Sequence, residues 1–157
     1  MKIEFLLFQG PPFKIYCNFE NGYLMRLYLK GQGLSDENKL KYLPRADHPF
    51  FKELENYFNG RLQKFTQKFI IENGTEFQMQ VWQALSKIKY GKVISYKELS
   101  FKIDRPGAQR SLGAALSKNP LPLIVPCHRV VRTNGNAGNF TGGDDIKMML
   151  LKLEGAL

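Results

Sequence analysis

The side chains best suited to covalent chemistry stand together in the segment Pro126-Cys127-His128-Arg129-Val130. A cysteine attacks as the thiolate, and cationic neighbours such as His128 and Arg129 favour that form. Free cysteine ionises at about pH 8.5, and each unit of depression corresponds to about 1.4 kcal/mol, so a modest electropositive site would raise the reactive fraction greatly. The alternative is an inert thiol buried beside the apolar run 121–125 that precedes it.

A carboxylate near the end of the chain could complete a relay with this pair. Glu154 stands at the end of a predicted helix, just before Gly155, where the helix dipole disfavours a negative charge by about 0.3–1 kcal/mol. A surface glutamate would tolerate that cost. A glutamate that orients His128 would instead give a Cys–His–Glu arrangement in which the base activates the thiol of Cys127.

Composition and charge restrict the kind of protein and its partner. The chain is 43% hydrophobic and carries 23 basic against 14 acidic side chains, with a net charge of +9. Between residues 84 and 132 there are ten basic residues and only two acidic ones, Glu98 and Asp104. Such a stretch attracts polyanions, of which nucleic acid is the commonest, although a solvated basic face is an equal alternative.

Targeting and redox signals are absent from the sequence. No apolar run reaches the length of a membrane span, and the N-terminal stretch has no small-residue cleavage site. Two cysteines, Cys17 and Cys127, are too few for a disulfide framework and have no metal-ligand spacing. We expect a soluble, cytoplasmic protein without a membrane partner.

The first half has the pattern of strands with one helix, and nothing in it concentrates reactive groups. Asn21-Gly22 favours a tight hairpin because both positions accept a positive φ. Aromatic residues at helical spacing predict a core-facing helix that ends at Asn59-Gly60. The predicted strands cover residues 1–8, 14–19, 23–30 and 65–72, and the predicted helix covers 49–58.

Asn73-Gly74 marks a boundary, which gives predicted domains over residues 1–72 and 73–157. The second is mainly helical. Capping boxes at Thr75-x-x-Gln78 and Ser95-x-x-Glu98 open two helices, of which the first ends at Tyr90-Gly91. A third helix has Pro106 in its first turn and runs to Lys118, and a fourth begins at Asp144.

The second and third of these helices have the spacing of a helix-turn-helix. The third is rich in small residues, with Arg110 as its only long basic side chain between Ala108 and Leu116. Small residues permit tight packing against another helix. They would equally let the helix enter a DNA minor groove while Arg110 fills a gap in the base stack.

Taken together, these motifs resemble the O6-alkylguanine-DNA alkyltransferase family in order and spacing through the whole second half. The first half resembles the family only weakly, through Tyr57-Phe58-x-Gly60 and its strand–helix–strand order. The motifs that carry the resemblance are Gly74-Thr75-x-Phe77-Gln78-x-x-Val81-Trp82, Tyr90-Gly91, Ser95-Tyr96-x-x-Leu99, Arg110-x-x-Gly113, Asn119-Pro120, Pro126-Cys127-His128-Arg129-Val130, Gly142-Gly143 and Leu153-Glu154-Gly155.

The resemblance implies an α+β protein in two parts. A small N-terminal α/β domain, an antiparallel sheet with a helix and ribonuclease-H-like, would precede a winged helix-turn-helix domain. The protein would repair DNA by direct reversal, moving the alkyl group of O6-alkylguanine, and of O4-alkylthymine, irreversibly onto Cys127 in a single turnover. It would act as a monomer on the minor groove of double-stranded DNA, without a cofactor.

The resemblance also implies roles for individual residues. Cys127 would be the acceptor, His128 its base through a water molecule, and Glu154 the holder of His128. Asn119 would brace the active-site turn, Tyr96 would turn the nucleotide and donate to the departing guanine, and Arg110 would fill the stack. Further DNA-binding residues would be Ser95, Gly107, Ala108 and Ala114, and the substrate pocket would comprise Leu116, Val130, Phe140, Thr141 and Gly142.

Three positions depart from the family. Phe140 stands where many members have a tyrosine, and Thr141, which would donate to O6, replaces the commoner serine. The zinc site of some members cannot form with Cys17 and His48 alone, so we expect no metal.

Three other functions remain as alternatives. A non-catalytic winged-helix regulator would explain the charge and helices but not the Cys–His–Glu set. A related group that binds lesions without transfer carries tryptophan at the reactive position, which Cys127 argues against. A cysteine hydrolase would also use Cys127 and His128, but it would turn over.

Overall fold

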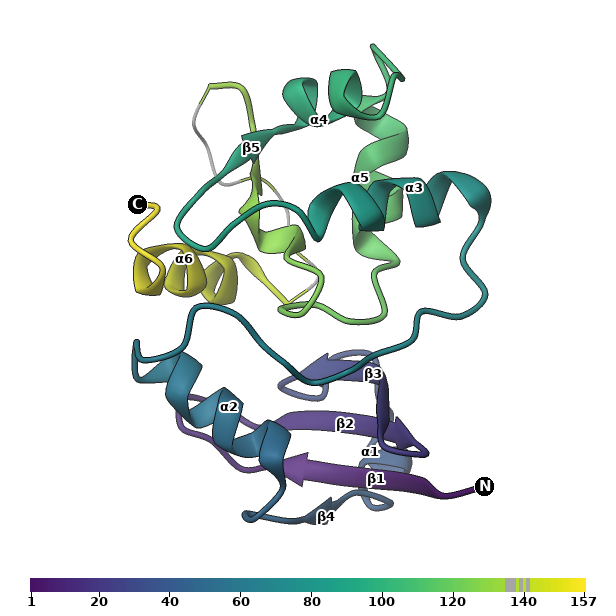
Figure 1. The fold of residues 1–157 in the computed structure, drawn as a ribbon, viewed down its shortest axis with the longest axis vertical. Coiled ribbons are helices and arrows are strands. Elements are labelled where there is room, and N and C mark those ends of the chain that lie inside the picture. The colour runs from purple at the N-terminus through teal and green to yellow at the C-terminus, as the bar shows by residue number, and fades with distance from the viewer. Residues whose placement is uncertain (135–137, 139, 141) are drawn as a thin grey trace. The chain divides into compact units, whose positions relative to one another are not determined.

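The chain folds as two units, residues 1–72 and 73–157, in the computed structural model (Figure 1). The structure describes every residue except 135–137, 139 and 141. It is a mixed α/β fold with a small sheet and several helices, as the sequence predicts. None of its described helices is long and apolar enough to cross a membrane.

A four-stranded sheet in the order β3-β2-β1-β4 forms the centre of the first unit. Asn21 and Gly22 take φ values of 50° and 83°, which closes the predicted hairpin between β2 and β3. The first three strands are antiparallel, as the predicted antiparallel sheet requires, but β4 pairs parallel to β1 and departs from that prediction. The strands are β1 Ile3–Phe8, β2 Ile15–Glu20, β3 Tyr23–Leu29 and β4 Leu43–Pro44.

The helix predicted over residues 49–58 is confirmed as α2 (Pro49–Phe58), which packs on the sheet. His48 caps it, since its Nδ1 accepts from the Phe50 amide at 3.1 Å. The aromatic side chains of α2 are core residues, with Phe51 edge-on to Phe8 of β1 at 5.6 Å between ring centroids. A short helix that the sequence did not indicate, α1 (Asp36–Lys39), precedes β4 and has no buried residue.

The strand predicted over residues 65–72 is wrong. Only Phe69 forms an isolated bridge, to Leu24 of β3. The amides of Thr66 and Gln67 donate instead to the Glu53 carboxylate of α2, at 2.7 and 3.0 Å, and are therefore not available to a sheet. Phe69 and Ile70 stay exposed, and the segment meets the sheet through backbone hydrogen bonds of Lys68 and Ile70 with Leu24.

The second unit contains the two capping boxes, and both are confirmed. Trp82 of the first helix donates its indole N–H to Ala115 O of the third at 3.0 Å, which fastens the helices together. The elements are α3 Glu76–Leu85, β5 Ile94–Ser95, α4 Tyr96–Lys102, α5 Gln109–Ser117, the 3-10 turn η1 Cys127–Arg129, β6 Val130–Val131 and α6 Asp144–Leu153.

Two predicted helix boundaries are wrong. The first helix, α3, ends at Leu85 instead of Tyr90-Gly91, because the amides after Ser86 bond to carbonyls three residues back and so tighten the chain into turns. The third helix, α5, begins at Gln109 instead of Pro106. Gly107 has a φ of 83°, which is incompatible with a right-handed helix at that position.

Candidate active site

A short parallel pairing holds the reactive segment. Ile94 of β5 pairs with Val130 of β6, so the start of α4, with Tyr96 as its first residue, lies beside the turn that carries Cys127. The turn itself is braced by Asn119, whose Nδ2 donates to Val125 O at 2.8 Å and whose Oδ1 accepts from the Leu121 amide at 2.9 Å. The side chain of Asn119 thus fixes the chain immediately before Cys127.

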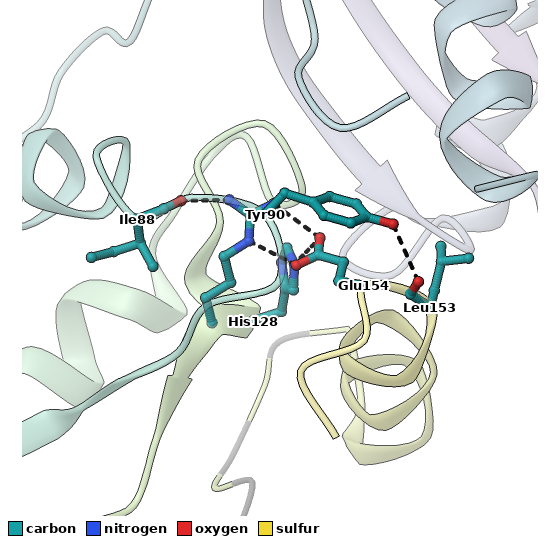
Figure 2. A network of polar contacts seen from close by, with 6 residues as sticks. Ile88, Tyr90, His128, Leu153 and Glu154 are labelled. Carbon is teal, nitrogen blue, oxygen red and sulfur yellow. Dashed lines mark hydrogen bonds and ion pairs between the residues drawn. The ribbon is translucent and has the colours of Figure 1, made fainter. Parts of the chain in front are cut away.

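The structure brings His128 and Glu154 into direct contact. His128 Nε2 lies 2.9 Å from Glu154 Oε2, and both side chains are completely buried (Figure 2). The other ring nitrogen, Nδ1, is the one buried side-chain polar atom in the described part of the chain that has no hydrogen-bond partner. A carboxylate only accepts, so Nε2 carries the proton and Nδ1 presents a lone pair.

Arg129 is a member of this cluster that the sequence analysis treated only as a charged neighbour. Its Nε donates to Glu154 Oε1 at 2.8 Å and its Nη2 to Oε2 at 2.9 Å, while Nη1 donates to Ile88 O at 2.6 Å. Tyr90, two residues after Ile88, donates a hydrogen bond from its hydroxyl to Leu153 O at 3.2 Å (Figure 2). The turn after α3 is therefore tied to the C-terminal end of α6 at two points.

Cys127 is buried and its thiol is protonated at neutral pH. Burial raises the pKa of Cys127 to about 11, although the hydrogen bond from the Asn119 side chain and the charge of Lys147 act in the opposite direction. The expectation that His128 and Arg129 favour the thiolate is therefore wrong. Arg129 forms an ion pair with Glu154. Burial lowers the pKa of His128, which leaves that ring neutral.

Lys147 is a second residue of the site that the sequence analysis did not identify. It is fully buried on α6, its Nζ donates to Val130 O at 2.6 Å, and burial lowers its pKa to about 8. Its spacing was the available signal, because it stands four residues before the buried Leu151 and therefore on the apolar face of the helix. It supplies a cation beside Val130 and Cys127.

An open pocket of about 660 Å³ lies beside Tyr96 and contains two arginines. Tyr96 is half-buried, and burial raises its pKa, while Arg132 opposes this shift. Gly138 lies against this ring, since a Cβ built on it would be 3.4 Å from the Tyr96 hydroxyl. The lining residues are Tyr96, Gln109, Arg110, Arg132 and Thr133, of which only Tyr96 and Arg110 were expected.

Two small residues of α5, Gly113 and Ala114, lie outside its buried face. The buried face of this helix is formed by Leu112, Ala115 and Leu116, whereas Arg110 and Ala114 are exposed. A Cβ built on Gly113 would meet nothing within 4 Å, so internal packing does not require glycine there. The thin surface is available to an external partner.

The other expected DNA and pocket residues occupy varied surroundings. Ser95 is buried and its hydroxyl accepts from the Glu98 amide at 3.0 Å, an arrangement that does not favour contact with DNA. Phe140 lies edge-on to His128, with ring centroids 6.4 Å apart, and Thr141 is outside the described residues. Gly107 is exposed, Ala108 is half-buried, and Leu116, Val130 and Gly142 are buried.

No group of three or more His, Cys, Asp or Glu side chains that could hold a metal ion occurs among the described residues. Both cysteines are free and buried, and Cys17 lies in the first unit.

Comparison with known proteins gives one consistent family. Residues 76–156 match the family model described as 6-O-methylguanine DNA methyltransferase, DNA binding domain. A methylated-DNA–protein-cysteine methyltransferase of Methanosarcina barkeri is 46% identical over 109 residues, which cover 67% of this chain and 68% of the relative.

Solved structures extend the likeness to almost the whole chain. The crystal structure of Mycobacterium tuberculosis O6-methylguanine methyltransferase has a TM-score of 0.85 at 30% identity and covers 99% of this chain and 94% of that one. A structure of the M. tuberculosis protein in complex with DNA has a TM-score of 0.84 at 32% identity and covers 98% and 93% of the two chains.

Proposed function

Because the chain belongs to the 6-O-methylguanine DNA methyltransferase family, we propose that it repairs alkylated DNA as a methylated-DNA–protein-cysteine methyltransferase, with Cys127 as the acceptor. The observation that carries this proposal is His128, which Glu154 holds through Nε2 and whose Nδ1 has no partner among the described residues, next in sequence to the buried thiol of Cys127. A buried thiol with a raised pKa needs such a base before it can attack carbon.

The transfer is a displacement at carbon. The proton of the Cys127 thiol passes through a water molecule to His128 Nδ1, and the resulting thiolate attacks the alkyl carbon. The S–C bond forms while the bond from that carbon to guanine O6 breaks, and both electrons of the broken bond leave with the guanine. The Tyr96 hydroxyl donates a hydrogen bond to this leaving group, which offsets its developing charge.

The substrate is double-stranded DNA that carries O6-alkylguanine, and O4-alkylthymine is a second substrate. The alkylated base leaves the stack to reach Cys127, because the reacting atom is not accessible inside a duplex. The helix-turn-helix of α4 and α5 binds the minor groove as part of a winged domain. The outward-facing Gly113 and Ala114 support close approach of α5 to DNA.

The first unit is a ribonuclease-H-like domain that does not contribute to the chemistry. Its sheet order, with three antiparallel strands and a fourth parallel to the first, supports this assignment. Residues 73–157 form the DNA-binding and alkyl-acceptor domain, and the protein acts as a monomer without a cofactor or metal.

Mass spectrometry tests the reaction directly. After incubation with duplex DNA containing O6-methylguanine, the intact protein should gain the mass that corresponds to replacing one hydrogen by a methyl group. Peptide mapping should place this methyl group on Cys127 and leave Cys17 unmodified. An unmodified protein, or a modification confined to another residue, would contradict the proposal, and unmethylated duplex DNA provides the control.

Arg110 is exposed at the pocket beside Tyr96, where it fills the gap left by the extruded base. Arg110→Ala should therefore slow transfer from duplex DNA by at least about tenfold, which corresponds to about 1.4 kcal/mol. Its reaction with free O6-benzylguanine should change little, because a free base leaves no gap. Single-turnover rates on both substrates provide the measurement. Equal losses of rate on the two substrates would contradict the role of Arg110 in filling the gap. Arg26→Ala on β3 is a matched control for loss of an exposed arginine.

A further inference from the structure

The carboxylate of Glu154 is shared between a permanent cation and a titratable ring. Arg129 donates to both of its oxygens, at 2.8 and 2.9 Å, whereas His128 contacts only Oε2 (Figure 2). This fork geometry is specific to arginine, whose guanidinium stays charged at all accessible pH values. The negative charge of Glu154 is therefore balanced by Arg129 regardless of the protonation state of His128.

The remaining donor of Arg129 fixes the position of the fork. Nη1 bonds to Ile88 O at 2.6 Å, and the side chain is only 9% exposed. The turn that supplies this carbonyl lies close to the end of α6, since a Cβ built on Gly91 would be 3.1 Å from Glu154 O. The Arg129–Glu154 pair is thus built into the packing of two segments that are far apart in the sequence.

Without Arg129, the uncompensated negative charge of the buried Glu154 would raise the pKa of His128. An opposite charge within hydrogen-bond distance favours the charged form of an ionisable group, and an uncompensated buried charge is costly. With Arg129 absent, an imidazolium at His128 would give Glu154 a cation within hydrogen-bond distance. That imidazolium carries protons on both nitrogens and cannot accept another from Cys127.

We propose that Arg129 is a positioning residue that balances the charge of Glu154, so that Glu154 orients His128 as a neutral base with its proton on Nε2 and Nδ1 open. The inference rests on the proposed function only for its kinetic consequence. The protonation state itself is a property of the protein before any DNA binds.

The other charged groups around His128 act in a consistent way. Burial lowers its pKa, and Glu154 opposes this shift, both through its hydrogen bond and through its charge. The cations Arg129, from the same turn, and Lys147, from α6, reinforce the lowering. Arg129 donates to the carboxylate that holds the ring, and Lys147 donates to Val130 O.

The first experiment measures the transfer rate against pH. Single-turnover rates are recorded from about pH 5.5 to 9. Arg129→Met should shift the acidic limb of the pH–rate profile, where protonation of His128 lowers the rate, to a higher pH by about one pH unit or more. The deficit should shrink at the alkaline end, where His128 loses the extra proton. Arg129→Lys retains the charge, so its acidic limb should stay near that of the unchanged protein, with a lower rate throughout because the fork is lost. A merely structural role would lower the rate by the same factor at every pH.

The second experiment needs no substrate, and its first measurement needs no substitution in the site. The chain has only two histidines, so nitrogen-15 spectra of histidine-labelled protein contain two imidazole rings, and His48→Gln assigns them. His128 should be neutral at pH 7, with its proton on Nε2, and should become protonated only at a lower pH than a free histidine. In Arg129→Met, if it folds, the same ring should become protonated at a higher pH.

The outcomes separate this inference from the proposed function. A doubly protonated His128 at pH 7 in the unchanged protein would overturn it, as would an acidic limb that Arg129→Met leaves in place. A neutral His128 in a protein that never methylates Cys127 would support the inference and contradict the function. Arg26→Met should leave both the limb and the spectrum unchanged.

Discussion

Cys127→Ala should abolish methyl transfer while the protein continues to bind DNA. The sulfur of Cys127 accepts the transferred carbon, so its removal takes away the reaction itself, and transfer should fall below detection. DNA affinity should stay within about twofold, because the sulfur is buried and neutral and is not a phosphate contact. Radiolabelled methyl transfer and a gel-shift or anisotropy titration on the same duplex provide the two measurements.

Cys17→Ala is the matched control for this experiment. Cys17 is also free and fully buried, burial raises its pKa, and it lies in the other unit, so its loss should leave the transfer intact. A Cys127→Ala protein that loses DNA affinity to the same degree as activity would show that the thiol region is part of the DNA-binding surface. Methyl transfer that persists in Cys127→Ala would assign the acceptor to another residue.

Local patterns in the sequence were sufficient for most of the fold. The hairpin at Asn21-Gly22, the helix over 49–58 and both capping boxes depend on residues within a few positions of each other, and all are present. The segment over 65–72 has the same local character as a strand, yet Glu53 of α2 binds its amides. That competition arises only once the chain has folded, so no local pattern could reveal it.

The candidate site divides in the same way. Cys127, His128 and Glu154 were found because their side-chain types imply a relay, and the structure puts His128 against Glu154. The fork from Arg129 and the buried amine of Lys147 depend on which charges end up inside the protein. Charge alone does not show burial: Arg129 and Arg132 are three positions apart, but only Arg129 is buried.

The pKa of Cys127 illustrates the limit in energetic terms. Neighbouring cations in the sequence predicted a thiolate, but Arg129 is paired with Glu154 and His128 is neutral, so neither offsets the burial of the sulfur. A buried thiol is protected from adventitious oxidation and becomes reactive only when a base removes its proton. The relay that the sequence predicts through His128 and Glu154 therefore has to activate the thiol without help from the charges of His128 and Arg129.

The protein should act once and then stop. Mixed with excess duplex DNA containing O6-methylguanine, it should give a burst of no more than one equivalent of repaired guanine, followed by no further reaction. The bond formed on Cys127 is a thioether, and thioethers do not undergo the thiolate exchange that resolves disulfides. Cys17, in the other unit, therefore offers no route to regeneration.

Hydrolysis does not regenerate the Cys127 thiol from the thioether either. The scarce hydroxide of neutral water is a poor nucleophile toward a carbon bound to sulfur, and Cys127 is only 4% exposed, which restricts access to that carbon. The sequence also contains no glycine-rich dinucleotide or phosphate-binding loop for a cofactor that might remove the group. Repaired guanine measured against titrated active protein over several hours decides the matter. Accumulation beyond one equivalent would identify a true catalyst and would require a group that regenerates the Cys127 thiol.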